Sequence, residues 1–196
     1  MTTMRRLAIA ASPVILAGLF LMVAASTTTG TAFGADMTAL RSLVGPGEPA
    51  PPFTLKALDG KTVAFRPGNG KPSLIVFWSA FCPLCRELTP AVNEIARRHR
   101  ATIRFASINL DGKRFTNAIH SFVKENGITY PVLLDSLRGD FFIASDPYGV
   151  EKTPTAVLVD ASGKVHSTYA AERMKEVVGK FDEIVTPLIK AKTVKK

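Results

Sequence analysis

Cys82 and Cys85 are the only two cysteines of this 196-residue chain, and two residues separate them in the stretch FWSAFCPLCRELTP, residues 77–90. Such a pair forms a redox couple, half of a zinc site or a structural disulfide. Structural zinc takes four ligands, usually with a second close pair of Cys or His. The sequence has no second pair, and its three histidines lie far apart, at His99, His120 and His166. A disulfide across so short a loop restrains the unfolded chain little. The spacing therefore favours a redox-active dithiol over a metal site or an inert bridge.

The cysteine pair follows an apolar run and opens a helical pattern. The run PSLIVFW (72–78) shows no alternation, which indicates a strand buried on both faces. Apolar residues then recur at helical spacing through residues 84–95. A sulfur at such a junction meets the free N–H groups and the positive dipole end of a helix, which stabilise a thiolate. We therefore expect Cys82 to attack the partner's sulfur and Cys85, one turn further on, to resolve the mixed disulfide. Pro83 suits the first turn of a helix.

The rest of the chain predicts one α/β domain. Residues 53–65 predict a hairpin at Asp59-Gly60, residues 103–110 and 130–135 further buried strands, and residues 114–127 a second helix. A short segment at 139–150 has helical character. Residues 153–170 predict an antiparallel pair, and residues 172–190 a final amphipathic helix. This order implies a sheet with helices on both faces.

The stretch FWSAFCPLC resembles the Trp-Ala-x-Trp-Cys-x-x-Cys active site of thioredoxin-like proteins, with Trp78 at the first tryptophan and Phe81 at the second. Residues 47–189 resemble the exported TlpA-like thiol-disulfide oxidoreductases. That likeness also rests on GEPAPPFTLKALDGKTV, FVKENGITYPVLLD and YGVEKTPTAVLVDASGKV. The resemblance implies a thioredoxin-like fold: a central mixed sheet, an N-terminal hairpin extension and an inserted helix–strand unit. It also implies thiol-disulfide exchange with client proteins.

The resemblance further implies a cis Thr153-Pro154 bond that forms the floor of the substrate site, with the Thr153 backbone pairing to the client. Trp78, Phe81, Pro83 and Leu84 are expected to support the site. Two acidic residues of the family pattern are replaced by apolar ones in this sequence. Val76 stands where thioredoxins carry a buried acid, and Leu88 stands where many TlpA-like proteins carry a Glu. Glu87 comes one residue earlier on the helix. It is a candidate proton relay, with a solvent-facing or ion-paired position as the alternative.

The N-terminus predicts export. Arg5 and Arg6 precede an uncharged apolar run of residues 7–25, and small or polar residues follow. This pattern is that of a signal peptide, and it is nearly long enough for a membrane anchor of about 20 residues. We therefore expect residues 1–35 to be a cleaved signal or an uncleaved anchor, 36–46 a linker, 47–190 the thioredoxin-like domain and 191–196 a basic tail. The protein is then expected in the periplasm, soluble or anchored to the cytoplasmic membrane.

Charge and motifs narrow the partners. The formal net charge is +9. The sequence nevertheless lacks the alternation of basic and aromatic residues that would indicate nucleic-acid binding. We expect no cofactor beyond the Cys82–Cys85 disulfide and no metal. The resemblance suggests a reducing role on client cysteines, as in cytochrome c or copper-site maturation, with electrons from a membrane donor. A copper metallochaperone and a peroxiredoxin-like peroxidase are the alternatives.

Overall fold

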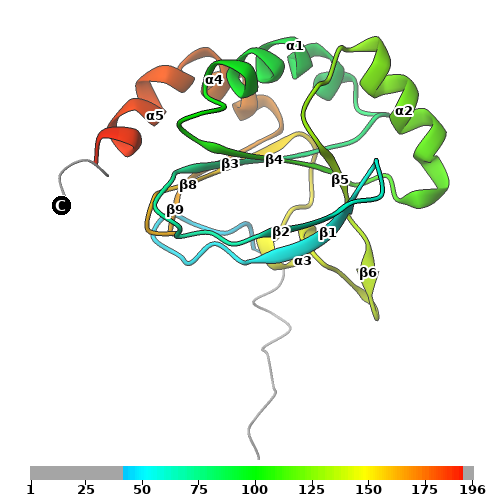
Figure 1. Ribbon diagram of the computed structural model, residues 1–196, viewed down its shortest axis with the longest axis horizontal. Coiled ribbons are helices and arrows are strands. Elements are labelled where there is room, and N and C mark those ends of the chain that lie inside the picture. The colour runs from blue at the N-terminus through cyan, green and yellow to red at the C-terminus, as the bar shows by residue number, and fades with distance from the viewer. Residues whose placement is uncertain (1–41, 192–196) are drawn as a thin grey trace, which may run out of the picture. The chain divides into compact units, whose positions relative to one another are not determined.

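The computed structural model describes residues 42–191, and its main element is a seven-stranded mixed sheet (Figure 1). Its strands are β1 (Phe53–Ala57), β2 (Thr62–Phe65), β3 (Ser73–Trp78), β4 (Arg104–Asn109), β5 (Val132–Leu134), β8 (Thr155–Val159) and β9 (Val165–Ala170). They are ordered β2-β1-β5-β4-β3-β8-β9. Strands β3, β4 and β5 are parallel, and β8 is antiparallel to β3. The carboxyl ends of three strands therefore meet at one edge of the sheet.

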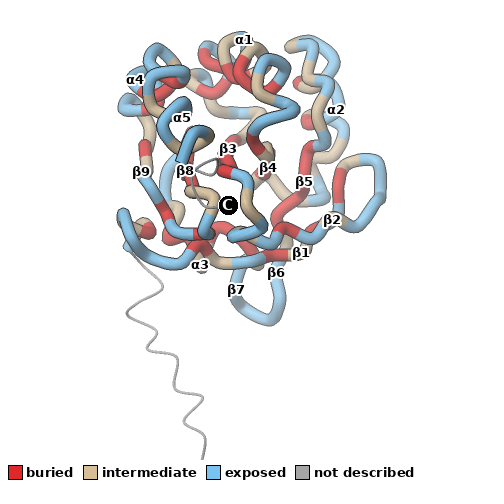
Figure 2. Tube along the Cα trace, turned by 60° about the vertical axis from the view of Figure 1, so that its left-hand side comes forward, coloured by how far each residue is buried: buried red, intermediate tan, exposed pale blue. Residues whose placement is uncertain are grey.

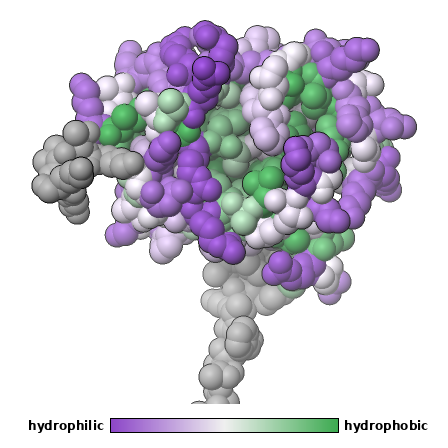
Figure 3. All heavy atoms as spheres, viewed as in Figure 1, coloured by the Kyte–Doolittle hydropathy of each residue, from purple (hydrophilic) through white to green (hydrophobic). Residues whose placement is uncertain are grey.

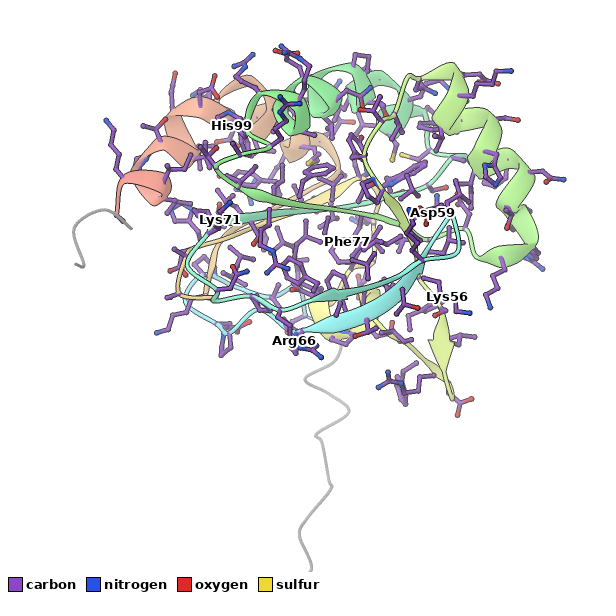
Figure 4. The ribbon with its side chains drawn as sticks, in the orientation of Figure 1. Lys56, Asp59, Arg66, Lys71, Phe77 and His99 are labelled. Carbon is purple, nitrogen blue, oxygen red and sulfur yellow. The ribbon has the colours of Figure 1, made fainter. Side chains whose placement is uncertain are left out.

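The continuous apolar run became the inner strand β3, every residue of which is buried. Alternate side chains of β3 enter different cores. Ile75 and Phe77 pack with β1, β2 and α3 (Ser145–Tyr148), whereas Leu74 and Val76 pack beneath α1 (Pro83–Arg98). Phe77 lies inside the molecule, between β3 and the β1–β2 hairpin (Figure 4). A strand with a core on each side needs no polar face, which explains its unbroken hydrophobicity.

The helices divide unevenly between the two faces. One face carries α1, α2 (Thr116–Glu125), α4 (Met174–Gly179) and α5 (Phe181–Lys190). The other face is covered by the four-residue helix α3 and by the chain around Val44 and Ala50. Single 3-10 turns, η2 (Lys113–Phe115) and η3 (Ala171–Arg173), precede α2 and α4. A thioredoxin-like mixed α/β fold is thus confirmed.

Two predicted elements were wrong in part. The segment 139–150 is helical only in α3, because residues 137–142 form a separate antiparallel pair of β6 (Leu137–Arg138) and β7 (Phe141–Phe142). Gly139, with φ of 65°, supplies the left-handed turn between them. The final helix is broken at Lys180, which has φ of −120°. The glycine that precedes it, Gly179, is a poor helix former.

The domain boundaries are described only in part. Val44, within the predicted linker, is buried in the core, and its N–H donates to the Tyr148 carbonyl at 3.1 Å. The predicted segment 1–35 lies outside the described residues, as does nearly all of the predicted tail 191–196. Among residues 42–191, no helix is long and apolar enough to cross a bilayer.

Candidate active site

Cys82 is the N-cap residue of α1. Its backbone is extended, with φ of −89° and ψ of 115°, and its Sγ accepts a hydrogen bond from the Cys85 N–H at 3.1 Å. The first-turn N–H groups of a helix have no intrahelical acceptor. A sulfur in this position therefore takes the place that a Ser or Asp side chain holds at other N-caps. It lies at the positive end of the helix dipole. Pro83 occupies the first turn, as predicted.

Cys85 lies one turn into α1 and is buried, with 4% of its surface exposed. Burial and the neighbouring Cys82 thiol raise the pKa of Cys85 to about 12. The two cysteines are free thiols in this structure, and only Cys82 is partly exposed. Of the two cysteines, Cys82 is therefore the one with surface that a partner can reach, and Cys85 is held as a neutral thiol.

Thr153 and Pro154 face Cys82 from the loop before β8. Their peptide bond is cis, which confirms that expectation. The Cys82 Sγ lies 3.5 Å from the Thr153 carbonyl oxygen, to which a thiol can donate. The structure thus brings together two predicted site residues, Cys82 and Thr153, that are 71 positions apart in the chain.

A small cavity of about 20 Å³ lies beside Cys85, between α1 and the strands β3 and β4. Val76 and Leu88 line it, so the two positions at which the family pattern places an acid both contribute apolar walls. Its polar lining residues are Thr89, Ser107 and Tyr130, together with Trp78. The volume is enough for about one water molecule. Among residues 42–191, no carboxylate lines this cavity.

Trp78 and Phe81 have different surroundings. Trp78 is buried: its Nε1–H donates to Ser107 Oγ at 2.8 Å, and its ring packs on Phe122 with centroids 4.8 Å apart. Phe81 is 60% exposed and contacts the Phe115 ring edge-on at 5.1 Å. Trp78 is therefore a packing residue behind the cysteines, and Phe81 an apolar rim in front of them.

The remaining predicted residues lie on α1. Leu84 is half-buried against the core beneath the helix. Glu87 lies on the exposed side, where it forms an ion pair with Lys175 at 3.0 Å. The structure does not bring Glu87 to Cys85 or to its cavity, in agreement with the ion-paired alternative.

Asp111, which sequence reasoning missed, holds the loop that leads to Cys82. Its carboxylate accepts hydrogen bonds from Ser79 Oγ at 2.5 Å and from the Ala80 N–H at 2.7 Å. Asn109 Nδ2 also donates to it, at 2.8 Å. The signal that could have found it is its place directly after a strand parallel to β3, because the carboxyl ends of parallel strands share one edge.

The three histidines take no part in this site. His99 Nε2 lies 2.6 Å from Asp182 Oδ1 at the far end of α1, His166 contacts Ser167, and His120 is exposed on α2. Within residues 42–191, no cluster of three or more His, Cys, Asp or Glu could hold a metal ion.

Comparisons with known proteins identify the group of proteins that this chain resembles. The Redoxin family model matches residues 45–185. The thiol-disulfide oxidoreductase ResA of Halalkalibacterium halodurans is 26% identical over 170 residues, which span 86% of this chain and 93% of that protein. ResA of Bacillus anthracis is 30% identical over 141 residues, 72% of this chain and 79% of the relative.

Solved structures show the same fold. A Chlorobium tepidum protein described as a putative thiol:disulfide interchange protein DsbE superimposes with a TM-score of 0.63 at 24% identity. The match covers 74% of this chain and 99% of that one.

Proposed function

This chain belongs to the Redoxin family and is a thioredoxin-like thiol-disulfide oxidoreductase, and from that premise we propose that Cys82 and Cys85 carry out the exchange. The observation that carries the proposal is the contrast between the two sulfurs. Cys82 is a partly exposed residue whose Sγ accepts the Cys85 N–H at 3.1 Å at the start of α1, whereas Cys85 is buried. The first arrangement suits a nucleophile, and the second suits a resolving thiol.

In the first step, the Cys82 thiolate attacks one sulfur of a client disulfide. The client's S–S bond breaks, a Cys82–client disulfide forms, and the client's other sulfur leaves as a thiolate. The Thr153 carbonyl, 3.5 Å from Cys82 Sγ, lies where it can pair with the backbone of an extended client. Phe81, on the exposed rim, supplies apolar contact beside the attacked sulfur.

In the second step, Cys85 loses its proton and attacks Cys82 Sγ. The client's sulfur is displaced as a thiolate, so the client gains two electrons and the enzyme ends with a Cys82–Cys85 disulfide. Only a thiolate attacks, and the pKa of Cys85 is raised to about 12. With apolar Val76 and Leu88 in its cavity, this step depends on proton loss without a carboxylate base.

The trapping experiment tests these roles directly. Cys85→Ala in the full chain should accumulate a mixed disulfide with a disulfide-bonded model client such as insulin, detected as a reductant-sensitive adduct. The matched variant Cys82→Ala should form none. An adduct of Cys82→Ala equal to that of Cys85→Ala would contradict the assignment of the nucleophile.

The location and direction of exchange belong to the same proposal. The export pattern of residues 1–35 supports a site outside the cytoplasmic membrane, in the periplasm. We assign the protein a reducing role on client cysteines, for example in cytochrome c or copper-site maturation, with a membrane dithiol donor that restores the reduced pair. Thiol trapping in intact cells tests the direction. A mostly dithiol population supports a reductant, and a mostly disulfide population contradicts it.

A further inference from the structure

The β6–β7 hairpin exposes apolar side chains that the exchange reaction does not use. Four large hydrophobic residues are exposed within residues 42–191, and three of them are in this hairpin: Leu137 at 58%, Phe141 at 40% and Phe142 at 38%. The hairpin forms its own two-stranded sheet and projects below the main sheet in Figure 1. Figure 2 shows it exposed along its whole length. Clustered apolar exposure of this kind marks an interaction surface.

The hairpin is held rigidly at its base. Asp135, only 2% exposed, accepts the N–H groups of Ser136 and Ala144 through Oδ1 and that of Ser145 through Oδ2, at 2.8–3.1 Å. Also at the base, where β7 ends, Asp146 Oδ2 accepts the Phe142 N–H at 2.7 Å. The backbone at the base of the hairpin is thus bonded to the domain at both of its strands.

The hairpin lies close to the point where the described chain begins. It leads directly into α3, and the carboxyl end of α3 contacts the first described residues. A Cβ atom on Gly149 would meet the Ser42 carbonyl oxygen at 2.0 Å, and Val44 bonds to Tyr148. The 41 residues before Ser42 include the uncharged apolar run 7–25 that predicts a signal or anchor. In an anchored protein, the chain from the anchor therefore joins the domain at the carboxyl end of α3, one short helix away from the hairpin.

The charges around the hairpin suit a shallow position at a lipid surface. Arg66 and Arg138 line a groove of about 540 Å³ with Phe141, Phe142 and Ile143. Arg66 and the hairpin both lie at the lower side of the molecule in Figure 4, and Figure 3 shows green, apolar residues beside purple, hydrophilic ones at the surface there. Aromatic and arginine side chains together are favoured at the headgroup level. Asp140, at the turn, limits the depth to that level.

We propose that the β6–β7 hairpin docks on the surface of the bilayer, with Leu137, Phe141 and Phe142 at the level of the lipid headgroups. The proposal rests on the location proposed above. Because α3 and α1 cover opposite faces of the sheet, this orientation turns the face with α1 away from lipid. Phe81 belongs to that side, since it contacts Phe115 in the turn that leads into α2. Cys82 then stays accessible to clients while the domain is held at the membrane.

Tryptophan reporters test the docking. Full-length Phe142→Trp and Leu137→Trp are placed in phosphatidylethanolamine–phosphatidylglycerol vesicles with bromine on the upper acyl chains, a short-range quencher. The parent chain, which has Trp78 alone, provides the background, and Phe81→Trp is the matched control on the other face. We expect bromine to remove about half of the emission that each hairpin tryptophan adds, and none of that added by Phe81→Trp.

Each outcome decides the proposal. Absence of quenching in both hairpin variants overturns it, and so does equal quenching of Phe81→Trp. Hairpin tryptophans that native membranes shield from acrylamide, but bromine leaves unquenched, indicate a protein partner and also overturn it. Client trapping by Cys85→Ala in the same vesicles reports separately on the exchange: adducts without quenching refute the docking alone.

Discussion

The Ser79–Cys82 loop and the β6–β7 hairpin are built by the same device. The loop follows β3 and the hairpin follows β5, and the carboxyl ends of these two strands lie at the same edge of the sheet. Each segment exposes phenylalanine, and each is held by an aspartate just past a strand. Asp111 follows β4 and binds the loop, and Asp135 follows β5 and binds the base of the hairpin. Both carboxylates accept hydrogen bonds from the backbone, which fixes conformations that the apolar core does not determine.

The two regions differ in what the aspartate positions. The loop held by Asp111 ends at a 16-residue helix whose first N–H groups meet a sulfur. The hairpin held by Asp135 ends at a four-residue helix and carries no nucleophile. The comparison teaches that an aspartate that holds a segment is enough to expose its side chains at the surface. A reactive group arises only where the held segment also places a cysteine at the start of a long helix.

The largest expected effect is on stability. Asp135→Ala leaves three backbone N–H groups, two of them buried, without their acceptor. It should lower the free energy of unfolding by about 3–5 kcal/mol. Exchange by the molecules that remain folded should not change. Denaturant unfolding and insulin reduction at matched folded fraction measure the two quantities, with the exposed Asp140→Ala as control. A loss of exchange in folded Asp135→Ala would break the division between the regions.

Asp111→Ala should affect exchange more than stability, the reverse of Asp135→Ala. Its carboxylate is only partly buried, so we expect a loss of about 1–3 kcal/mol in unfolding free energy. Because the loop that carries Phe81 and Cys82 loses its support, exchange by folded protein should fall roughly tenfold to a hundredfold. The same two assays apply. An unchanged rate would show that the helix terminus positions Cys82 without Asp111.

The pH dependence sharpens the role of the reactive region. Since the pKa of Cys85 is raised to about 12, its thiolate fraction should increase about tenfold per pH unit between pH 7 and 9. Release of client from the preformed Cys82 mixed disulfide should accelerate to the same degree, measured in single-turnover experiments. Bromine quenching at the hairpin should stay constant. A flat release profile would point to a base at Cys85 that the cavity lining does not include.

The smallest expected effect concerns Glu87. Its exposed ion pair with Lys175 lies away from Cys85, and such pairs contribute little. Glu87→Gln should therefore leave the unfolding midpoint and the pH profile of client release unchanged, and Lys175→Gln is the matched control. A slower release in Glu87→Gln alone would restore this carboxylate as a proton relay.

Most of the sheet was predictable because its strands and helices carry strong local patterns. The predictions of the strand β3 and of a helix after Cys82 were correct, as were those of the β1–β2 and β8–β9 pairs. The prediction failed where local pattern is weak. The segment with Phe141 and Phe142 has no alternation long enough to indicate strands. Its base is held by the buried Asp135, which accepts the N–H groups of Ala144 and Ser145, nine and ten positions away.

The chemistry of this protein was already present in the order of its residues: two cysteines after a buried strand and at the start of a helix fix which atoms can exchange, since that junction is a local property of the backbone. Tertiary structure alone brought Thr153 to Cys82, Asp111 to the Ser79–Cys82 loop and the apolar cavity to Cys85. The contacts of Thr153 and Asp111 join residues 31 to 71 positions apart, and strand order decides them. Local propensity cannot encode strand order, because it is settled by burying both faces of the sheet at once.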